Sequence, residues 1–494
     1  MKMLAFDLGA SSGKIFLGHF DGSALTLDEV SRFRNEQIAV RDELFWDALE
    51  IFRNLREGIS ASLQAHADIA SLGIDSFSND FGLLDKSGRF ITQVHSYRDQ
   101  RTARNEAQIY SMLSKERLHH LCGNQNALFG TLMQLAAMRL EDQAYLLDGS
   151  GTLLLLPDLF NYFLTGEARS EYTVASVSQM MDFSSGDWSQ EILDTFGIPR
   201  TLMAPIVQPG ARIGKISDGW GKSAGGSAPE VVAVCEHDTA SAFLSAPLGA
   251  DAIIISSGTW SLVGVEAAQP VINDYTFQHN IANEGGYPGH HRLLKNVMGL
   301  WLIQECRRFY GARGEDYSYE ALVEAARQAA PFRFMINPDD VRFFAPGDMP
   351  EKIGDFCEEN GQGKPEAVGD IIRCVLESLA LQYRLVFEEL ETAAGRRFSQ
   401  VNIVGGGSNN QLLNQLAANA SGKTVLAGPD EATAIGNMLV QLISFGELDS
   451  VAQGRSLVRA SFSMTEFKAE HTADWDVRYR DYLKMITARR KKNE

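Results

Sequence analysis

The sequence MLAFDLGASSGKIFL, residues 3–17, carries the clearest structural pattern in the chain. A turn of small residues, positions 9–14, lies between two apolar strands, which is typical of a β-hairpin. The stretch IIISSGTWSLVGV, residues 253–265, repeats that order of apolar strand, glycine and hydroxyl turn, and apolar strand. The two stretches lie about half the chain apart. They indicate two copies of one domain facing each other, and a coincidence between two ordinary hairpins is the alternative.

The second half of the chain alternates between helix and strand. Apolar residues recur at spacings of three and four over residues 368–390, which predicts an amphipathic helix that ends before Gly395. The strand 401–404 follows, then three glycines at 405–407, then a second helical pattern. A strand, a glycine turn and a helix allow backbone N–H groups to meet a nucleotide, although three glycines alone are a weak signal. The fold class is therefore α/β.

The length and the net charge of the chain bear on its number of domains and on its partners. A chain of 494 residues exceeds what one hydrophobic core usually supports, so two large domains are expected. The net charge is −18, from 45 basic and 63 acidic residues. This excess of negative charge disfavours nucleic acids and anionic membranes as partners, because Lys and Arg drive phosphate binding. ATP is not excluded, because local amides and a metal ion build a small phosphate site.

The cysteines and the apolar runs indicate the cellular compartment in which the protein is expected. The five cysteines are scattered, odd in number and without a C-x-x-C pair, which argues against disulfides and structural zinc. Free, mostly buried thiols in a reducing compartment are expected. The longest aliphatic run, residues 153–156, ends at Pro157 and is far too short to span a membrane. We therefore expect a soluble, cytoplasmic protein.

Asp7 ends the first strand beside the small-residue turn. Its carboxylate could hold Mg²⁺ through water, while Ser11, Ser12 and Lys14 approach phosphate groups together with the turn amides. An Asp that caps an ordinary hairpin turn is the alternative, and taken alone it is favoured. The turn at Gly258 is a second candidate of the same kind.

The segment His237-Asp238-Thr239 follows an apolar strand at residues 231–234. An Asp at the end of a buried strand is a plausible general base for a sugar hydroxyl. The alternative is that Asp238 caps the N-terminus of a helix that starts near Ala240, and the two roles do not exclude each other. A P-loop and the protein-kinase motifs are both missing, so another fold must hold ATP if ATP is used.

The order and spacing of ten segments resemble the carbohydrate kinases of the FGGY family, within the actin-like ATPase superfamily. The resemblance covers nearly the whole chain, and no single segment is decisive, but ten in register are very specific. The segments are residues 7–14, 97–102, 157–166, 171–176, 237–241, 256–262, 283–286, 294–302, 404–408 and 428–434.

The resemblance implies two ribonuclease-H-like domains that flank a catalytic cleft, with residues 1–245 on the sugar and phosphate side and residues 246–485 on the nucleotide side. By the same resemblance Asp238 is the proton acceptor and Asp7 is the Mg²⁺-side carboxylate. The sugar is expected at Ser78, His237, Asp238, Thr239 and Asn296. The phosphates and the nucleotide are expected at Ala10, Ser11, Ser12, Gly13, Lys14, Gly258, Thr259, Gln304, Gly405, Gly406 and Gly407.

The implied activity is ATP-dependent phosphorylation of a ketose, L-rhamnulose, to the 1-phosphate by a monomer or homodimer. L-fuculose and L-xylulose are alternative substrates. An actin-like ATPase or a sugar-responsive regulator without kinase activity is an alternative of another class.

Two departures from the family pattern bear on these expectations. Lys14 stands where related kinases usually carry Arg, which turns a bidentate phosphate contact into a point-charge contact. The segment 76–80, Ser-Phe-Ser-Asn-Asp, replaces a Thr-Trp-Gly-Val-Asp type of sequence, so Ser78 stands in place of a glycine expected against the sugar. Its hydroxymethyl group needs space and a hydrogen-bond partner. The segment therefore puts the exact sugar in doubt.

Overall fold

The computed structural model describes residues 1–217 and 228–493. The chain folds into two compact units. The first unit contains Met1–Pro247, Glu266–Leu293 and Ala432–Ser461, and the second contains Leu248–Val265, Leu294–Glu431 and Phe462–Glu494. Two segments from the second half of the chain thus belong to the first unit. The division of the sequence at residues 245 and 246 stays a prediction.

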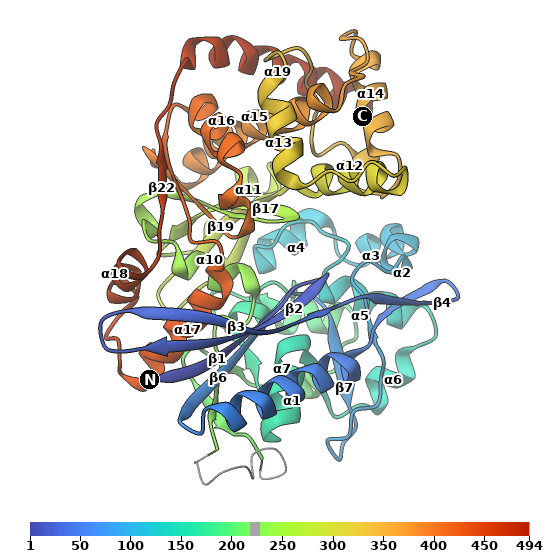
Figure 1. The fold of residues 1–494 in the computed structure, drawn as a ribbon. Coiled ribbons are helices and arrows are strands. Elements are labelled where there is room, and N and C mark those ends of the chain that lie inside the picture. The colour runs from blue at the N-terminus through green and yellow to red at the C-terminus, as the bar shows by residue number, and fades with distance from the viewer. Residues whose placement is uncertain (218–227, 494) are drawn as a thin grey trace. The chain divides into compact units, whose positions relative to one another are not determined.

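A six-stranded sheet forms the centre of the first unit, with the order β14-β15-β6-β1-β2-β3 (Figure 1). Strands β1 and β2 form the predicted antiparallel hairpin, and β6 lies parallel to β1 on its other side. The strands are β1 (Lys2–Leu8), β2 (Ser12–Phe20), β3 (Leu25–Arg34), β6 (Ile69–Ser76), β14 (Arg212–Lys215) and β15 (Glu230–Val232).

The turn of the first hairpin is shorter than predicted. Strand β2 begins at Ser12, so Ser12, Gly13 and Lys14, expected in the turn, already pair with neighbouring strands. Gly13 can do so because it has no side chain: a Cβ there would collide with the ring of Phe33 on β3. The glycine therefore allows an aromatic ring to cross the strand where the turn was expected to continue.

The seven-stranded sheet has the order β18-β19-β17-β16-β20-β21-β22. Its hairpin β16–β17 is antiparallel, β20 is parallel to β16, β21 is parallel to β20, and β22 is antiparallel to β21. The six-stranded sheet follows the same plan from β1–β2 through β6 and β15 to β14. This shared topology confirms that the two hairpins are equivalent parts of a repeated fold. The strands are β16 (Ile253–Ser257), β17 (Trp260–Ala267), β18 (Ala282–Gly285), β19 (His291–Met298), β20 (Gln400–Val404), β21 (Thr424–Ala427) and β22 (Thr465–Phe467).

The long helix of the second unit is α15 (Val368–Ala394), and it confirms the prediction from apolar spacing. It ends at Gly395, which adopts φ +66°, a conformation that glycine reaches without steric cost. The other helices of this unit are α12 (Trp301–Ala312), α13 (Tyr319–Gln328), α14 (Met349–Glu359), α16 (Gln411–Ser421) and α19 (Thr472–Asn493).

Two hydrophobic clusters of the first unit lie within the residues that the structure describes. One packs α1 and α7 against the six-stranded sheet, through side chains such as Phe6, Leu55 and Phe160. The other gathers shorter helices around residues such as Leu132 and Phe196. The helices are α1 (Ala48–Ala65), α2 (Arg101–Arg104), α3 (Glu106–Met112), α4 (Lys115–Cys122), α5 (Thr131–Leu140), α6 (Ala144–Gly149), α7 (Leu156–Thr165), α8 (Tyr172–Ser176), α9 (Gln190–Thr195), α10 (Asp238–Ser245), α11 (Asp274–Gln278), α17 (Ala432–Phe445) and α18 (Val451–Ser461).

Short strands outside the two large sheets complete the first unit. The small sheets are β4-β5-β8, β7-β9, β10-β13 and β11-β12. Their strands are β4 (Gln37–Val40), β5 (Glu43–Trp46), β7 (Phe81–Leu84), β8 (Val94–His95), β9 (Thr152–Leu155), β10 (Ser170–Glu171), β11 (Met181–Asp182), β12 (Asp187–Trp188) and β13 (Ile206–Val207).

Two expectations from the sequence concern the cysteines and the membrane-spanning helices. The five cysteines are free and buried, as predicted. Among residues 1–217 and 228–493, no helix combines the length and the apolar character that a membrane span requires.

Helix α17 enters the first unit from late in the chain and packs against α10. Its side chains Asn437 and Gln441 make buried hydrogen bonds to the sheet: Asn437 Nδ2 donates to Asp75 Oδ2 at 2.6 Å, and Gln441 Nε2 to the Leu4 carbonyl at 2.9 Å. At Gly436, a Cβ would overlap the backbone of Ser241 in α10. The two helices can therefore approach this closely only because position 436 has no side chain.

We expect Gly436→Ala to destabilise the protein by about 1–3 kcal/mol, because the added methyl meets backbone atoms that cannot rotate away. Thermal unfolding measures the effect. The matched control is Gly311→Ala, at another helical glycine where a Cβ would meet nothing within 4 Å. That variant should be neutral or slightly more stable, since Ala favours helix over Gly. Equal stability of the two variants would contradict the close helix packing.

Candidate active site

Three neighbouring parallel strands place the predicted residues of the first unit at one edge of its sheet. The Ser76 N–H, at the end of β6, donates to the Glu236 carbonyl at 2.9 Å, and the Phe77 N–H donates to the Leu8 carbonyl of β1 at 3.1 Å. These bonds bring together the chain segments that follow β1, β6 and β15. Asp7, Ser78 and the His237–Thr239 segment therefore belong to one sheet edge.

Asp238 is the first residue of α10, and this corrects one expectation. The helix begins two residues earlier than Ala240, its N-cap is His237, and no side chain caps it. The Asp238 carboxylate instead accepts the backbone N–H of Thr239 at 2.6 Å and the Thr239 hydroxyl at 3.2 Å, both on Oδ1. Its side chain is 31% exposed. Asp238 is therefore held from one side and accessible from another, as a general base requires.

His237 lies beside Asp238 and is oriented by Arg292. Arg292 Nη2 is 3.1 Å from His237 Nδ1, and a guanidinium can only donate. Nδ1 must then be an acceptor, so the proton of the neutral ring is on Nε2, which lies 3.5 Å from Asp238 Oδ1. The Arg292 contact therefore directs the His237 N–H toward Asp238.

Glu284 completes this cluster. Its Oε2 is 3.0 Å from Arg292 Nη2 and 3.4 Å from His237 Nδ1. Burial opposes ionisation, but the positive charge of Arg292 lowers the pKa of Glu284. Neither Glu284 nor Arg292 was predicted as a site residue. The segment 283–286 carried a signal, because it is one of the ten matching segments.

Asp75 is a third carboxylate at this edge and was missed from the sequence. In the sheet register Asp7 pairs with Lys14 on one side and with Asp75 on the other. Asp75 is fully buried, and burial together with the carboxylates of Asp7 and Asp238 raises its pKa, against the hydrogen bond from Asn437. The neighbouring carboxylates of Asp7 and Asp238 therefore favour the protonated form of Asp75.

Carboxylate oxygens are the ligands that Mg²⁺ prefers. In the described ranges, 1–217 and 228–493, no three such side chains lie close enough to ligate one metal directly. The Mg²⁺ site at Asp7 stays a prediction. Asp75 Oδ1 is also buried without a hydrogen-bond partner in that part of the chain.

Asn35 holds the turn between β1 and β2. Its Nδ2 donates to the Gly9 carbonyl at 2.9 Å and its backbone N–H to the Ser11 carbonyl at 3.1 Å. The Gly9 N–H closes the turn on the Ser12 carbonyl at 3.0 Å. The predicted phosphate turn is thus fixed by a buried side chain that sequence inspection did not single out, while Ser11 stays exposed.

The unusual segment around Ser78 satisfies its own polar groups. Asn79 Nδ2 donates to Ser78 Oγ at 2.8 Å. Asn79 has φ +82°, a left-handed conformation that Asn tolerates better than most residues. Its carbonyl accepts the Thr131 hydroxyl at 2.8 Å and Gln134 Nε2 at 3.2 Å. The neighbouring Asn therefore supplies the partner that the Ser78 hydroxyl needs.

In the second unit, the turn between β16 and β17 meets the first turn of α12. The Leu300 N–H donates to the Gly258 carbonyl and the Trp301 N–H to the Thr259 carbonyl, both at 3.1 Å. The Thr259 hydroxyl donates to Gln304 Oε1 at 3.2 Å. Three predicted nucleotide-side residues, Gly258, Thr259 and Gln304, are therefore in one contact network.

The three glycines after β20 lie against the same turn. A Cβ on Gly407 would collide with Ser257 Oγ, and a Cβ on Gly405 would come to 3.0 Å from the Ser257 carbonyl. Gly405 also has φ +82°. Gly406, in contrast, faces open space. The glycines at 405 and 407 thus let two backbone turns approach closely.

Asn296 lies on β19 in the second unit. Its Oδ1 is buried without a hydrogen-bond partner among the residues that the structure describes. An unpaired buried acceptor suits a ligand hydroxyl, but the role of Asn296 at the sugar stays a prediction.

Three buried carboxyl groups support the His237–Asp238 segment from inside the first unit. Glu171 Oε2 accepts the Glu236 backbone N–H at 3.2 Å and the Thr173 hydroxyl at 2.6 Å. Thr173 Oγ1 in turn accepts the His237 N–H at 3.2 Å. Burial raises the pKa of Glu171 to about 7. The carboxyl group of Glu171 and the hydroxyl of Thr173 therefore hold the backbone beside Asp238 in place.

Asp158 and Glu236 form a buried pair of acids behind this segment. Asp158 Oδ1 accepts the Glu171 N–H at 2.8 Å, and Glu236 Oε1 accepts Asn161 Nδ2 at 2.7 Å. The two side chains hydrogen-bond each other, and burial raises both pKa values well above the ordinary range. Yet Asp158 Oδ2 and Glu236 Oε2 have no other donor within the described ranges. Two buried carboxyl oxygens can bond only when a proton lies between them.

The chain matches known carbohydrate kinases along most of its length. Residues 2–245 match the N-terminal domain, and residues 253–445 the C-terminal domain, of the FGGY family of carbohydrate kinases. A rhamnulokinase of Bacteroides thetaiotaomicron is 40% identical over 479 residues, 97% of this chain and 98% of that protein. A rhamnulokinase of Yersinia pestis is 42% identical over 476 residues, 96% of each. The xylulose kinase structure from Lactobacillus acidophilus superposes with a TM-score of 0.83 at 14% identity, over 99% of this chain and 98% of that one.

Proposed function

The chain belongs to the FGGY family of carbohydrate kinases, and we propose that it transfers the γ-phosphate of ATP to the 1-hydroxyl of L-rhamnulose. The observation that carries the sugar assignment is the similarity of about 40% identity to proteins named rhamnulokinase over nearly the full length of both chains. Rhamnose catabolism is the corresponding role.

Asp238 is the proposed base. Its exposed carboxylate accepts the proton of the sugar hydroxyl as that oxygen attacks the γ-phosphorus and the bond to the leaving ADP oxygen breaks. The Thr239 N–H and hydroxyl hold the carboxylate in position. His237, with its proton directed to Nε2 by Arg292, donates to Asp238 or to the sugar beside it. These contacts orient the base before the sugar arrives, which reduces the cost of reaching the reactive geometry.

In the first unit, the Gly9–Lys14 turn is proposed to bind phosphate groups. In the second unit, the Gly258–Thr259 turn and Gly405–Gly407 are proposed to bind the nucleotide. Asp7, with Asp75 behind it, would hold Mg²⁺ through water. When bound, Mg²⁺ neutralises charge on the transferred phosphoryl group. Lys14, opposite Asp7 in the sheet register, adds a point charge where a guanidinium would make two parallel bonds.

ADP release measured with L-rhamnulose, L-fuculose, L-xylulose and their aldose isomers tests the function. We expect kcat/KM to be highest for L-rhamnulose and turnover without sugar to be negligible. A preference of a hundredfold or more for L-fuculose or L-xylulose would overturn the sugar assignment and leave the kinase intact. ADP release independent of any sugar would favour an ATPase instead.

Ser78 is proposed to contact the sugar, and deletion of its hydroxyl tests this. We expect Ser78→Ala to lower kcat/KM for L-rhamnulose by about 5–100-fold, because a buried sugar hydroxyl or Asn79 loses a partner worth ~1–3 kcal/mol. The KM for ATP should not change. The control is Ser111→Ala, an exposed serine of α3 whose hydroxyl bonds only to its own helix. A changed KM for ATP with an unchanged sugar ranking would contradict the contact.

A further inference from the structure

An aromatic cluster lies beside the chain segment that carries the proposed base. Ser76 forms a parallel bridge with His237, so the segment that follows β6 lies beside the segment that leads into α10. The ring centroid of Tyr97 is 6.0 Å from that of Phe77 and 6.2 Å from that of Phe129, which it meets edge-on. Phe77 is buried, whereas Tyr97 and Phe129 are partly exposed. The cluster therefore adds an apolar surface to this edge of the sheet.

Tyr97 is close enough to Asp238 to be affected by its charge. Burial raises the pKa of Tyr97, Arg98 opposes this effect, and the carboxylates of Asp80 and Asp238 add to it. Arg98 Nε donates to the Tyr97 hydroxyl at 3.1 Å, and the backbone N–H of Tyr97 donates to the Asp80 carboxylate. The Tyr97 side chain is therefore within the electrostatic range of the proposed base.

Gln134 is buried and joins the chain segments that carry this cluster. Its Nε2 group donates to the Asn79 carbonyl at 3.2 Å and to the Phe129 carbonyl at 3.3 Å. It also donates to Asp80 Oδ1 at 2.9 Å, and its Oε1 atom accepts Arg101 Nη2 at 2.6 Å. The side chain of Gln134 therefore holds the backbone on both sides of the cluster.

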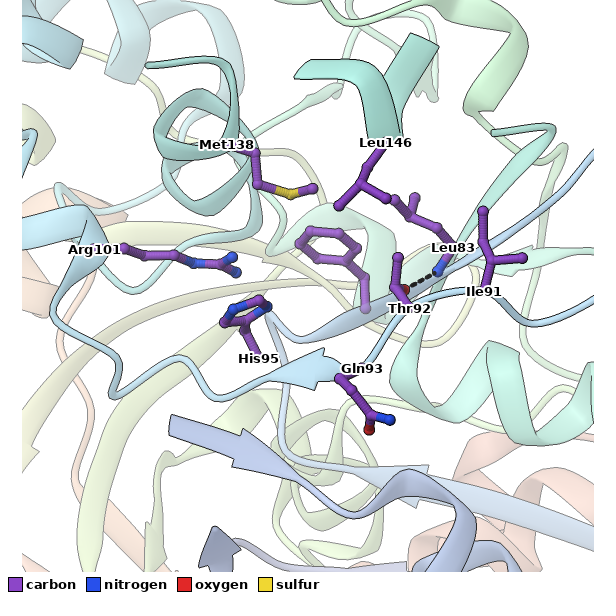
Figure 2. Close-up of a pocket in the computed structure, with 9 residues that line it drawn as sticks. Leu83, Ile91, Thr92, Gln93, His95, Arg101, Met138 and Leu146 are labelled. Carbon is purple, nitrogen blue, oxygen red and sulfur yellow. Dashed lines mark hydrogen bonds between the residues drawn. The ribbon is translucent and has the colours of Figure 1, made fainter. Parts of the chain in front are cut away.

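The loop that carries Tyr97 is anchored at both of its ends. The Asp99 carboxylate accepts the Arg101 backbone N–H at 2.8 Å, and His95 Nε2 lies 3.1 Å from Glu43 Oε1. Figure 2 shows the Arg101 guanidinium beside the His95 ring, where both side chains line one cavity. The aromatic cluster is thus held in place before a sugar arrives, which lowers the cost of binding.

We propose that Tyr97 and Phe129 bind the C6 methyl group of the sugar and so select a 6-deoxyketose, a step that rests on the proposed function. L-rhamnulose is 6-deoxy-L-fructose, and C6 is its one carbon without oxygen. With the 1-hydroxyl at Asp238, the sugar extends along the neighbouring segment, where Ser78 meets its hydroxyl groups and the two rings meet its methyl group. An apolar wall gains by burying a methyl group, but it leaves a hydroxyl group without a hydrogen-bond partner.

L-fructose is the matched probe, because it differs from L-rhamnulose only by a hydroxyl group on C6. We expect wild-type kcat/KM to be about 10–100-fold higher for L-rhamnulose, the range over which an apolar pocket rejects an added hydroxyl group. Phe129→Ser should lower this ratio roughly fivefold or more, through a loss with L-rhamnulose, and Tyr97→Ser should act in the same direction. The KM for ATP should not change. A merely structural role would lower both kcat/KM values equally and leave their ratio unchanged.

Two control variants should keep the ratio within about twofold of wild type. Phe129→Leu retains an apolar surface, and Tyr145→Ser changes an exposed aromatic residue of α6. If Phe129→Ser does not fold, Phe129→Tyr decides: it adds a hydroxyl group to the wall and should shift the ratio roughly threefold or more toward L-fructose.

The outcomes separate this selection from the proposed function. A wild-type protein that phosphorylates L-fructose as well as L-rhamnulose would overturn the selection alone. So would an unchanged ratio in Phe129→Ser, or in Phe129→Tyr where the serine variant does not fold. A wild-type protein that does not phosphorylate L-rhamnulose would overturn the proposed function, and the selection with it.

Discussion

Asp238→Asn should reduce kcat by ~10²–10⁴-fold, the range that general-base catalysis usually contributes. The amide keeps an oxygen for the Thr239 N–H and hydroxyl, so the first turn of α10 should stay in place. It cannot accept the proton of the sugar hydroxyl. Affinity for ATP and thermal stability should therefore change little, and steady-state kinetics with L-rhamnulose as the varied substrate measure the loss.

The control for this variant is Asp274→Asn, which also changes the first residue of a helix, at an exposed position. It should retain full activity. If Asp238→Asn retained more than a tenth of the wild-type turnover, Asp238 would be a structural residue and another group would accept the proton. A large loss of ATP affinity would place Asp238 on the nucleotide side.

The shared proton between Asp158 and Glu236 predicts a strongly non-additive double variant. In Glu236→Gln the amide N–H replaces the shared proton and its oxygen still accepts Asn161 Nδ2. In Asp158→Asn the same substitution works from the other side, since the amide oxygen still accepts the Glu171 N–H. Each single variant should cost less than about 1 kcal/mol. The double variant has two amide donors facing each other and should lose about 3 kcal/mol more than the two singles together.

The pH dependence of the single variant follows from the raised pKa of Glu236. A buried acid with a raised pKa contributes its full stability below its ordinary value of 4.5, and this stability is lost as the pH rises toward the folded value. Glu236→Gln removes this proton linkage. The stability of Glu236→Gln relative to wild type should therefore rise from pH 5 toward pH 8, by at most about 1.4 kcal/mol per pH unit.

Chemical denaturation at several pH values measures both effects. Glu230→Gln, at a partly exposed glutamate on β15, is the control and should show no such pH trend. Additive losses in the double variant would contradict the shared proton. So would a stability difference between Glu236→Gln and wild type that does not change with pH.

Patterns local in the sequence predicted most of the architecture. The sequences of the two hairpins predicted the repeated sheet, because small residues between apolar strands leave few other conformations. The apolar spacing that ends at Gly395 gave the bounds of α15 closely, since a glycine in left-handed conformation ends a helix without strain. The start of β2 was misplaced because the contact of Gly13 with the Phe33 ring depends on pairing with a third strand.

The residues that support the candidate site could not be predicted from local sequence patterns. Asp75 is bonded by Asn437, 362 residues away, through a helix that the sequence assigns to the other half of the chain. His237 is oriented by Arg292, 55 residues later. Such contacts arise from tertiary packing, and no spacing rule along the chain reports them.

The position of the new phosphate on the product distinguishes the proposed reaction from its alternatives. After incubation with ATP, Mg²⁺ and L-rhamnulose, two-dimensional ³¹P–¹H correlation NMR identifies the carbon that carries this phosphate. The proposed function predicts one phosphomonoester coupled to the two protons on C1, formed in equal amount to ADP by the wild-type protein and almost absent with Asp238→Asn. Inorganic phosphate in place of a sugar ester, or a phosphate on another carbon of L-rhamnulose, would contradict it.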